Sequence, residues 1–147
     1  WARARATVRV GMLLTGGAAS VIGLILWLLR EPVIGLSTAD AGVHTVALGL
    51  IVYICLYQLF DSVQTVASHA LRGYKVTLLP MLLHTLCFWG IGLGLGYWLS
   101  FHAPWRVASP TVAGFWEAGV LATILASVLF GMLLRRVMRT QGDGFVR

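Results

Sequence analysis

Residues 43–67 read VHTVALGLIVYICLYQLFDSVQTVA, and this stretch decides the fold because it is long, apolar and interrupted by a single acid, Asp61. A helix that spans a bilayer needs about 20 predominantly apolar residues. A carboxylate near the centre of such a helix costs about 2.5–3.5 kcal/mol on insertion scales. Asp61 is therefore expected to face protein or water and to serve an ion, a proton or a substrate.

The composition of the chain is that of a membrane protein. Of its 147 residues, 59% are hydrophobic and 11% are charged, and the mean hydropathy is +0.86. A soluble domain usually carries about 25% charged residues. The net charge of +6 comes from short basic clusters between apolar runs, which is a topology signal, and no aromatic–basic pattern predicts nucleic-acid binding. Cys55 and Cys87 lie inside apolar segments and are expected to be small core residues.

Four apolar segments have the length of a spanning helix, at about residues 7–29, 43–67, 76–101 and 112–134. Short connections with proline and glycine separate them, and no long hydrophilic linker marks a second domain. The sequence therefore predicts an all-α membrane protein with four transmembrane helices.

The basic residues alternate between the two sides of this predicted fold. Arg3, Arg5 and Arg9 precede the first helix, whereas the first connection balances Arg30 against Glu31 and Asp40. The remaining basic residues are Arg72 and Lys75 in the second connection, Arg106 alone in the third, and Arg135, Arg136, Arg139 and Arg147 at the C-terminal end. The positive-inside rule then places both termini and the second connection in the cytoplasm.

A polar stripe surrounds Asp61 on the second helix. At about 100° per residue, five polar side chains fall within roughly 60° of the carboxylate. They are Tyr57, Gln58, Gln64, Thr65 and Ser68. A stripe of this kind is unfavourable against lipid, so it should face protein or water. Asp40 lies on the same side near the outer end of the helix, where it either binds a cationic substrate or caps the helix.

A lone carboxylate in a membrane can hold a proton, a sodium ion or an organic cation. Amide and hydroxyl oxygens beside Asp61 suit a hard monovalent cation, so sodium is the metal expected there. The alternative is an ion pair with a basic residue of another helix, which would only fix the packing. His84 in the third helix has two similar interpretations, a packed and hydrogen-bonded side chain or a proton relay.

Residues 57–80, YQLFDSVQTVASHALRGYKVTLLP, resemble the tenth helix and following loop of the multidrug and toxic compound extrusion (MATE) family. The bacterial NorM-type branch is the most similar. The matching residues are Gln58, Asp61 and Gln64, the run from Ala70 to Lys75, Pro80, Phe88-Trp89-Gly90, Gly96-Tyr97 and Gly114-Phe115-Trp116. The resemblance covers residues 1–147 as the last four of twelve membrane helices. The N-terminal lobe and the first two helices of the C-terminal lobe would then be absent.

The resemblance implies efflux of cationic organic drugs by antiport against sodium ions or protons across the cell inner membrane, with no cofactor. Asp61 would belong to the cation-coupling site and contribute to substrate binding, and Asp40 would lie where cationic drugs bind near the outer opening. The partners would be the lipid bilayer, the drugs and the missing N-terminal part, with no nucleic acid.

Three features depart from the family pattern. A glutamate of the seventh helix that shares cation binding would precede Trp1, His69 stands where members carry a small or aromatic residue, and residues 92–96 lack a common proline. The first residue is Trp1, and four helices rarely enclose a cavity with two gates. A larger N-terminal part is therefore expected.

Two other functions are compatible with the residues alone. The chain could be an independent four-helix protein that exports compounds as an oligomer, or a non-transporting subunit of a membrane assembly. No arrangement of Ser, His, Asp or Cys predicts catalysis, so an enzyme is not expected.

Overall fold

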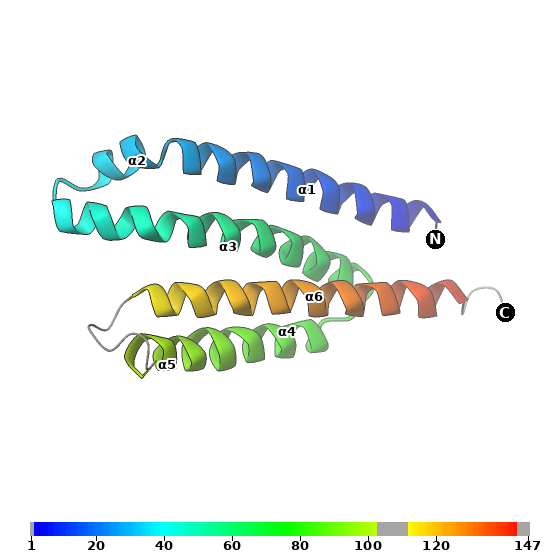
Figure 1. Ribbon diagram of the computed structural model, residues 1–147. Helices are drawn as coiled ribbons and strands as arrows, with labels where there is room; N and C mark the ends of the chain where they lie inside the picture. The colour runs from blue at the N-terminus through cyan, green and yellow to red at the C-terminus, as the bar shows by residue number, and fades with distance from the viewer. Residues whose placement is uncertain (1, 103–111, 144–147) are drawn as a thin grey trace.

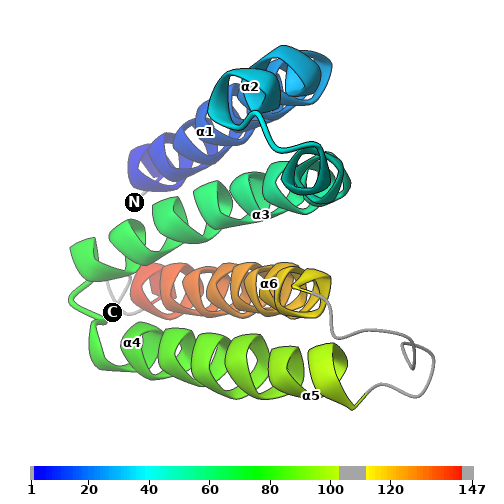
Figure 2. The ribbon, with the colours of Figure 1, turned by 90° about the vertical axis from the view of Figure 1, so that its left-hand side faces the viewer.

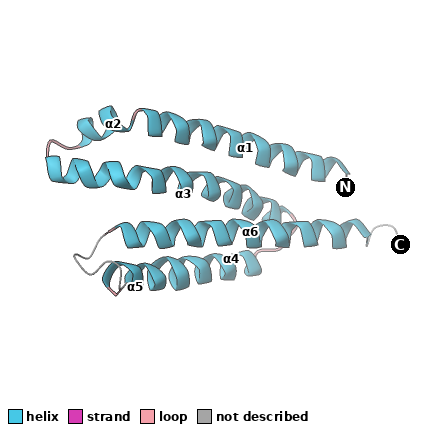
Figure 3. Ribbon diagram, viewed as in Figure 1, coloured by secondary structure: helices cyan, strands magenta, loops and turns pink. Residues whose placement is uncertain are grey.

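The computed structural model describes residues 2–102 and 112–143, without the side chains of residues 2, 4 and 141–143. All regular structure in these ranges is helical (Figure 3). Three helices form the first half of the chain, α1 (Ala2–Leu28), α2 (Arg30–Ser37) and α3 (Ala41–Gly73). A continuous rod follows, built of α4 (Leu78–Thr85), the π-helix η1 (Leu86–Leu95) and α5 (Gly96–Phe101). The last helix is α6 (Ala113–Asp143).

Four stretches are long and apolar enough to cross a membrane, Arg5–Leu28, Ala41–Gly73, Leu78–Phe101 and Ala113–Thr140. The predicted all-α fold with four spanning helices is therefore confirmed. The helices run further than predicted, because α3 continues past Ala67 and α6 continues past Leu134 through the arginines. Long basic side chains can stay helical at a membrane surface because their charged ends reach back to water.

Helix α6 lies at the centre of the array although it comes last in the sequence. Figures 1 and 2 both show the rods in the order α1, α3, α6 and α4–η1–α5. Within the most apolar window of each helix, 44% of α6 is buried but only 6% of α3. The apolar side chains that α1 and α3 leave exposed need lipid or further protein against them.

One end of the array holds the start of α1, the end of α6 and the turn between α3 and α4 (Figure 1). This grouping agrees with the predicted alternation of the basic clusters. The assignment of this end to the cytoplasm stays a prediction. Trp1, Arg147 and the third connection with Arg106 lie outside the described residues.

The first connection is not the loop that its proline and glycine suggest. Residues 30–37 form α2, and Val33 N donates to Leu29 O at 3.0 Å, so the two helices nearly join. Pro32 is tolerated because it lies in the first turn of α2, where backbone N–H groups have no partner inside the helix. The break follows at Thr38, whose backbone is extended.

The turn between α3 and α4 is closed by hydrogen bonds at the end of α3. Val76 N donates to Leu71 O at 3.0 Å, and Lys75 N donates to Arg72 O at 2.9 Å. This pattern is a Schellman motif, which places the residue after the cap in the left-handed region. That residue is Lys75, with φ 62°, and α3 itself ends at Gly73.

The core forms where α3 meets α6. Ala67, Leu71, Phe130 and Leu134 are almost fully buried there. At the opposite end of α6, glycine permits a much closer approach of helix to helix. A Cβ at Gly114 would lie 2.5 Å from Ser100 Oγ, 2.7 Å from Ser100 N and 2.9 Å from Leu99 C, so backbone atoms as well as a side chain fill that space.

We expect Gly114→Ala to lower the free energy of unfolding by about 1–3 kcal/mol, because the added methyl group pushes α5 away from α6. Gly119→Ala in the same helix is the matched control, since a Cβ there meets no described atom within 4 Å. Thermal unfolding in detergent measures both variants. Equal melting temperatures for the two would contradict the close packing at Gly114.

Candidate functional site

Asp61 lies in a cavity of about 270 Å³ between the C-terminal half of α3 and the beginning of α4. Helix α3 contributes Asp61, Gln64, Thr65, Ser68, His69 and Arg72, and the α4 side contributes Thr77, Pro80, Met81 and His84. Every α3 member except His69 and Arg72 belongs to the polar stripe expected from helical periodicity. The cavity gives the carboxylate a polar surrounding inside the membrane-spanning part of the chain.

Two members of the expected stripe lie elsewhere. Tyr57 is half-buried and packs edge-on against Phe88 of η1, with ring centroids 6.4 Å apart. Gln58 is exposed and does not line the cavity. The polar face that surrounds Asp61 is thus narrower than the stripe, and it is directed toward α4.

A hydrogen bond joins the two helices across the cavity. Gln64 Nε2 and His84 Nδ1 are 2.7 Å apart, and Gln64 is only 3% exposed. The His84 ring also stacks on Phe88, with centroids 4.4 Å apart. The stacked ring and the buried amide hold each other in place, so His84 belongs to the site.

The second polar atom of Gln64 has no partner. Its Oε1 is buried and makes no hydrogen bond among the described residues. Buried polar atoms nearly always have a hydrogen-bond partner, so a buried oxygen without one requires an explanation. An oxygen acceptor without a donor, in one cavity with a carboxylate and two hydroxyl side chains, suits a cation or a water molecule.

Asp40 is far from this cavity, at the opposite end of α3. Its Oδ1 accepts hydrogen bonds from Gly42 N at 2.7 Å and Val43 N at 3.1 Å. This is the geometry of an N-cap, which is one of the two roles that the sequence allows. The cap occupies one carboxylate oxygen, and the side chain remains exposed.

His84 is the residue of this site that the sequence left undecided. Gln64 and His84 are twenty residues apart, and Tyr74 in the turn lies midway between them. In an antiparallel helix pair, positions equidistant from the turn meet at the same depth. This symmetry is the signal that could have paired the two side chains. His69 and Arg72 are exposed and line the same cavity.

Comparison with known proteins identifies the family of the chain. The MatE family profile matches residues 1–98 of the 147. The chain belongs to the MatE family. This finding confirms the resemblance drawn from residues 57–80 and the rest of the chain.

Bacterial relatives match nearly the whole chain. A probable multidrug resistance protein NorM of Aromatoleum aromaticum is 72% identical over 138 residues, which cover 94% of this chain and 30% of the relative. The protein of the same name from Chromobacterium violaceum is 40% identical, covering 88% of this chain and 27% of its own length. Multidrug resistance protein PmpM of Pseudomonas aeruginosa is 34% identical, covering 92% and 28%. No solved structure matches the chain.

The chain thus spans about 30% of the length of its curated MatE-family relatives. With its four spanning helices, it is a multi-pass membrane protein, as predicted. An inner-membrane location is consistent with relatives that are all bacterial.

We expect His84→Phe to lower the free energy of unfolding by about 1–2 kcal/mol, because a ring is kept against Phe88 but the buried Gln64 amide loses its partner. His69→Phe is the control, since the exposed His69 ring bonds only the Thr65 carbonyl of its own helix. Unfolding in detergent at neutral pH measures the difference. If both variants unfold alike, the Gln64–His84 bond does not hold α3 to α4.

Proposed function

We propose that this chain forms the last four helices of a MatE-family transporter that exports cationic organic compounds in exchange for sodium ions or protons. The observation that carries the proposal is the placement of Asp61 in a polar cavity beside the unpartnered Gln64 Oε1. The family and the names of the relatives support efflux of several drugs rather than an enzymatic reaction. The coupling ion is a substrate of the exchange, and the proposal needs no cofactor.

The cavity has the oxygen ligands that a small hard cation requires. Asp61 supplies the negative charge, and Gln64 Oε1 supplies a neutral oxygen that the protein leaves without a hydrogen bond. The hydroxyl groups of Thr65 and Ser68 line the same space. Sodium prefers oxygen ligands of these kinds, while a proton needs only the carboxylate. The two ions would therefore compete for Asp61.

The Gln64–His84 contact leaves one oxygen of the amide for a cation. With Gln64 Nε2 as the donor, His84 Nδ1 accepts, and Gln64 Oε1 stays available. The contact also fixes the position of the Gln64 side chain against α4.

Asp40 is proposed to contribute to drug binding through charge rather than through an enclosed pocket. It is exposed at the end of α3 opposite to the Asp61 cavity. One oxygen is used by the cap, and the carboxylate keeps its negative charge toward solvent. A cationic drug near this end would meet that charge. The two acids of α3 would then act on opposite sides of the transport path, one on the drug and one on the ion.

We expect Asp61→Asn in the full-length polypeptide that contains this chain to reduce ion-driven ethidium efflux to the level of vesicles without the protein. Asparagine keeps the size and hydrogen bonding of the side chain but removes the charge that binds the ion. Glu31→Gln is the matched control, an exposed acid of α2 outside the cavity. Efflux is recorded under a sodium gradient and then under a proton gradient, and membrane insertion is checked by blotting. Full driven efflux by the Asp61 variant under either gradient would refute its coupling role.

Two substitutions of Asp40 separate its role as a helix cap from the role of its charge. Asparagine caps helices about as well as aspartate, whereas Asp40→Ala removes the cap and costs about 1 kcal/mol. We therefore expect Asp40→Asn to keep the melting temperature and to weaken export of a cationic dye while sparing a neutral one. Asp40→Ala should also lower the melting temperature. If Asp40→Asn exports the cationic dye as well as the parent protein, the carboxylate serves only as a cap.

A further inference from the structure

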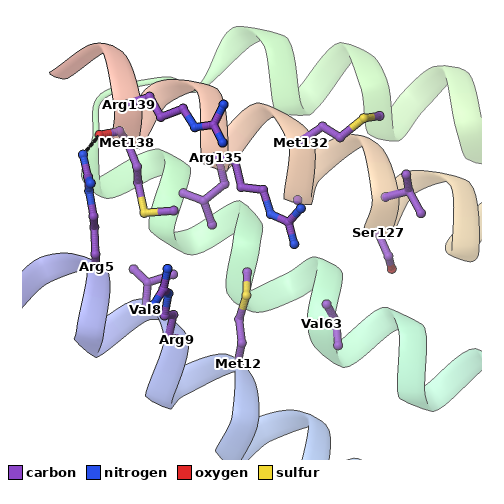
Figure 4. A pocket seen from close by; sticks show the side chains of 13 residues that line it. Arg5, Val8, Arg9, Met12, Val63, Ser127, Met132, Arg135, Met138 and Arg139 are labelled. Atoms are coloured by element: carbon purple, nitrogen blue, oxygen red, sulfur yellow. Dashed lines mark hydrogen bonds between the residues drawn. The ribbon is translucent and has the colours of Figure 1, made fainter. Parts of the chain in front are cut away.

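A second hollow, of about 700 Å³, opens between α1 and α6 at the end of the array where the two chain ends lie (Figures 1 and 4). Val63 of α3 lies on its floor, and α1 and α6 form its walls. We infer that this hollow, called here the arginine groove, binds the head group of an anionic phospholipid. The inference concerns lipid binding and does not depend on the transport reaction.

Four guanidinium groups line the arginine groove. Arg5 and Arg9 come from α1, and Arg135 and Arg139 come from α6. Each pair has a spacing of four residues, which places both members on one face of their helix. Figure 4 shows the α1 arginines extending toward α6 and Arg135 reaching into the space between the helices. Two pairs of arginines that lie far apart in the sequence therefore line the same groove.

No described acidic side chain pairs with this cluster. Among the described side chains, the ion pair that forms is His44 with Glu31, which lies at the other end of the array. Arg5 Nη2 donates to the carbonyl oxygen of Met138 at 2.7 Å and so ties α1 to α6. Arg9, Arg135 and Arg139 donate no hydrogen bond within the described part of the chain. Like charges held together in this way repel each other, and a bound anion removes the repulsion.

Apart from Ser127, whose hydroxyl donates to Phe60 O, the other side chains of the groove are apolar, and this favours a lipid over a soluble anion. Met12 on α1, Val63 on α3 and Met132 on α6 continue the hollow from the arginines toward the middle of the helices. A phosphate held by the guanidinium groups would sit at head-group level, because the arginines lie in the first turns of α1 and the last turns of α6. An acyl chain would then run along the apolar wall. Basic pockets between membrane helices bind anionic head groups in this manner.

The test compares two double variants with the same loss of charge. Arg9→Gln/Arg135→Gln removes one guanidinium from each wall of the groove. Arg3→Gln/Arg136→Gln removes two exposed arginines from the same helix ends that do not line it. The full-length polypeptide containing this chain is purified in detergent and titrated with phosphatidylglycerol in native mass spectrometry. Phosphatidylcholine with the same acyl chains serves as the neutral lipid, and inorganic phosphate as the soluble anion.

We expect the parent protein to prefer phosphatidylglycerol over phosphatidylcholine and the groove variant to bind phosphatidylglycerol roughly 30-fold more weakly, from the usual contribution of two arginines. The Arg3→Gln/Arg136→Gln variant should change the affinity little, because neither residue lines the groove. Arg9→Lys/Arg135→Lys, which keeps both charges, should retain most of the binding and thereby separates loss of charge from misfolding.

Three results would overturn the inference. The first is an equal loss of phosphatidylglycerol binding in the groove and control variants. The second is displacement of the lipid by inorganic phosphate at the same concentration, which would make this a soluble-anion site. The third is no preference of the parent protein for the anionic lipid, as expected if protein outside this chain fills the groove.

Discussion

Hydrocarbon offers no hydrogen-bond partner, and this constraint shapes both the backbone and the hydroxyl side chains of the chain. The backbone forms helices, which satisfy its hydrogen bonds internally, in all regular structure of the described residues. Many serine and threonine hydroxyl groups donate to the carbonyl oxygen one turn earlier in their own helix. Ser20, Thr45, Thr85 and Thr123 all do so. Few polar groups are left for contacts between helices, so those few have a large influence on how the helices pack.

Helix α3 takes part in most of the polar contacts between spanning helices, and the bond from Arg5 of α1 to Met138 of α6 is the exception among the described residues. It accepts from Ser127 of α6 at Phe60 O, 2.7 Å away, and its Tyr53 hydroxyl donates to Glu117 of α6 at 3.1 Å. Its Cys55 thiol lies 3.3 Å from Gly23 O of α1, and its Gln64 meets His84 of α4. The helix that carries Asp61 thus makes a polar contact with each of the other spanning helices. A fixed surrounding would suit the ion binding proposed for Asp61, because the geometry would not need to be rebuilt in each cycle.

The sequence was sufficient for the four spanning helices because length and hydropathy alone decide them. Helical periodicity also grouped Asp61 with Gln64, Thr65 and Ser68 without knowledge of the neighbours, and these four residues line one cavity. The sequence missed α2, where a proline in the first turn does not prevent a helix. It also missed the π-helical hydrogen bonding of η1, which is rare and depends on tertiary packing. The partner of Gln64 could not be read from periodicity, because that contact depends on how two helices meet across the turn at Tyr74.

The central position of α6 has a consequence for biosynthesis. A ribosome makes α1, α3 and α4 before α6, yet the nearly inaccessible side chains Ala67 and Leu71 of α3 are covered by Phe130 and Leu134 of α6. The nascent helices must therefore enter the membrane before their main partner exists. During this interval the face of α3 that carries Ala67 and Leu71 lacks its protein cover and lies against lipid or the insertion machinery. Translation that stalls before α6 would leave this apolar face without its partner, which would make the truncated chain a target for membrane quality control.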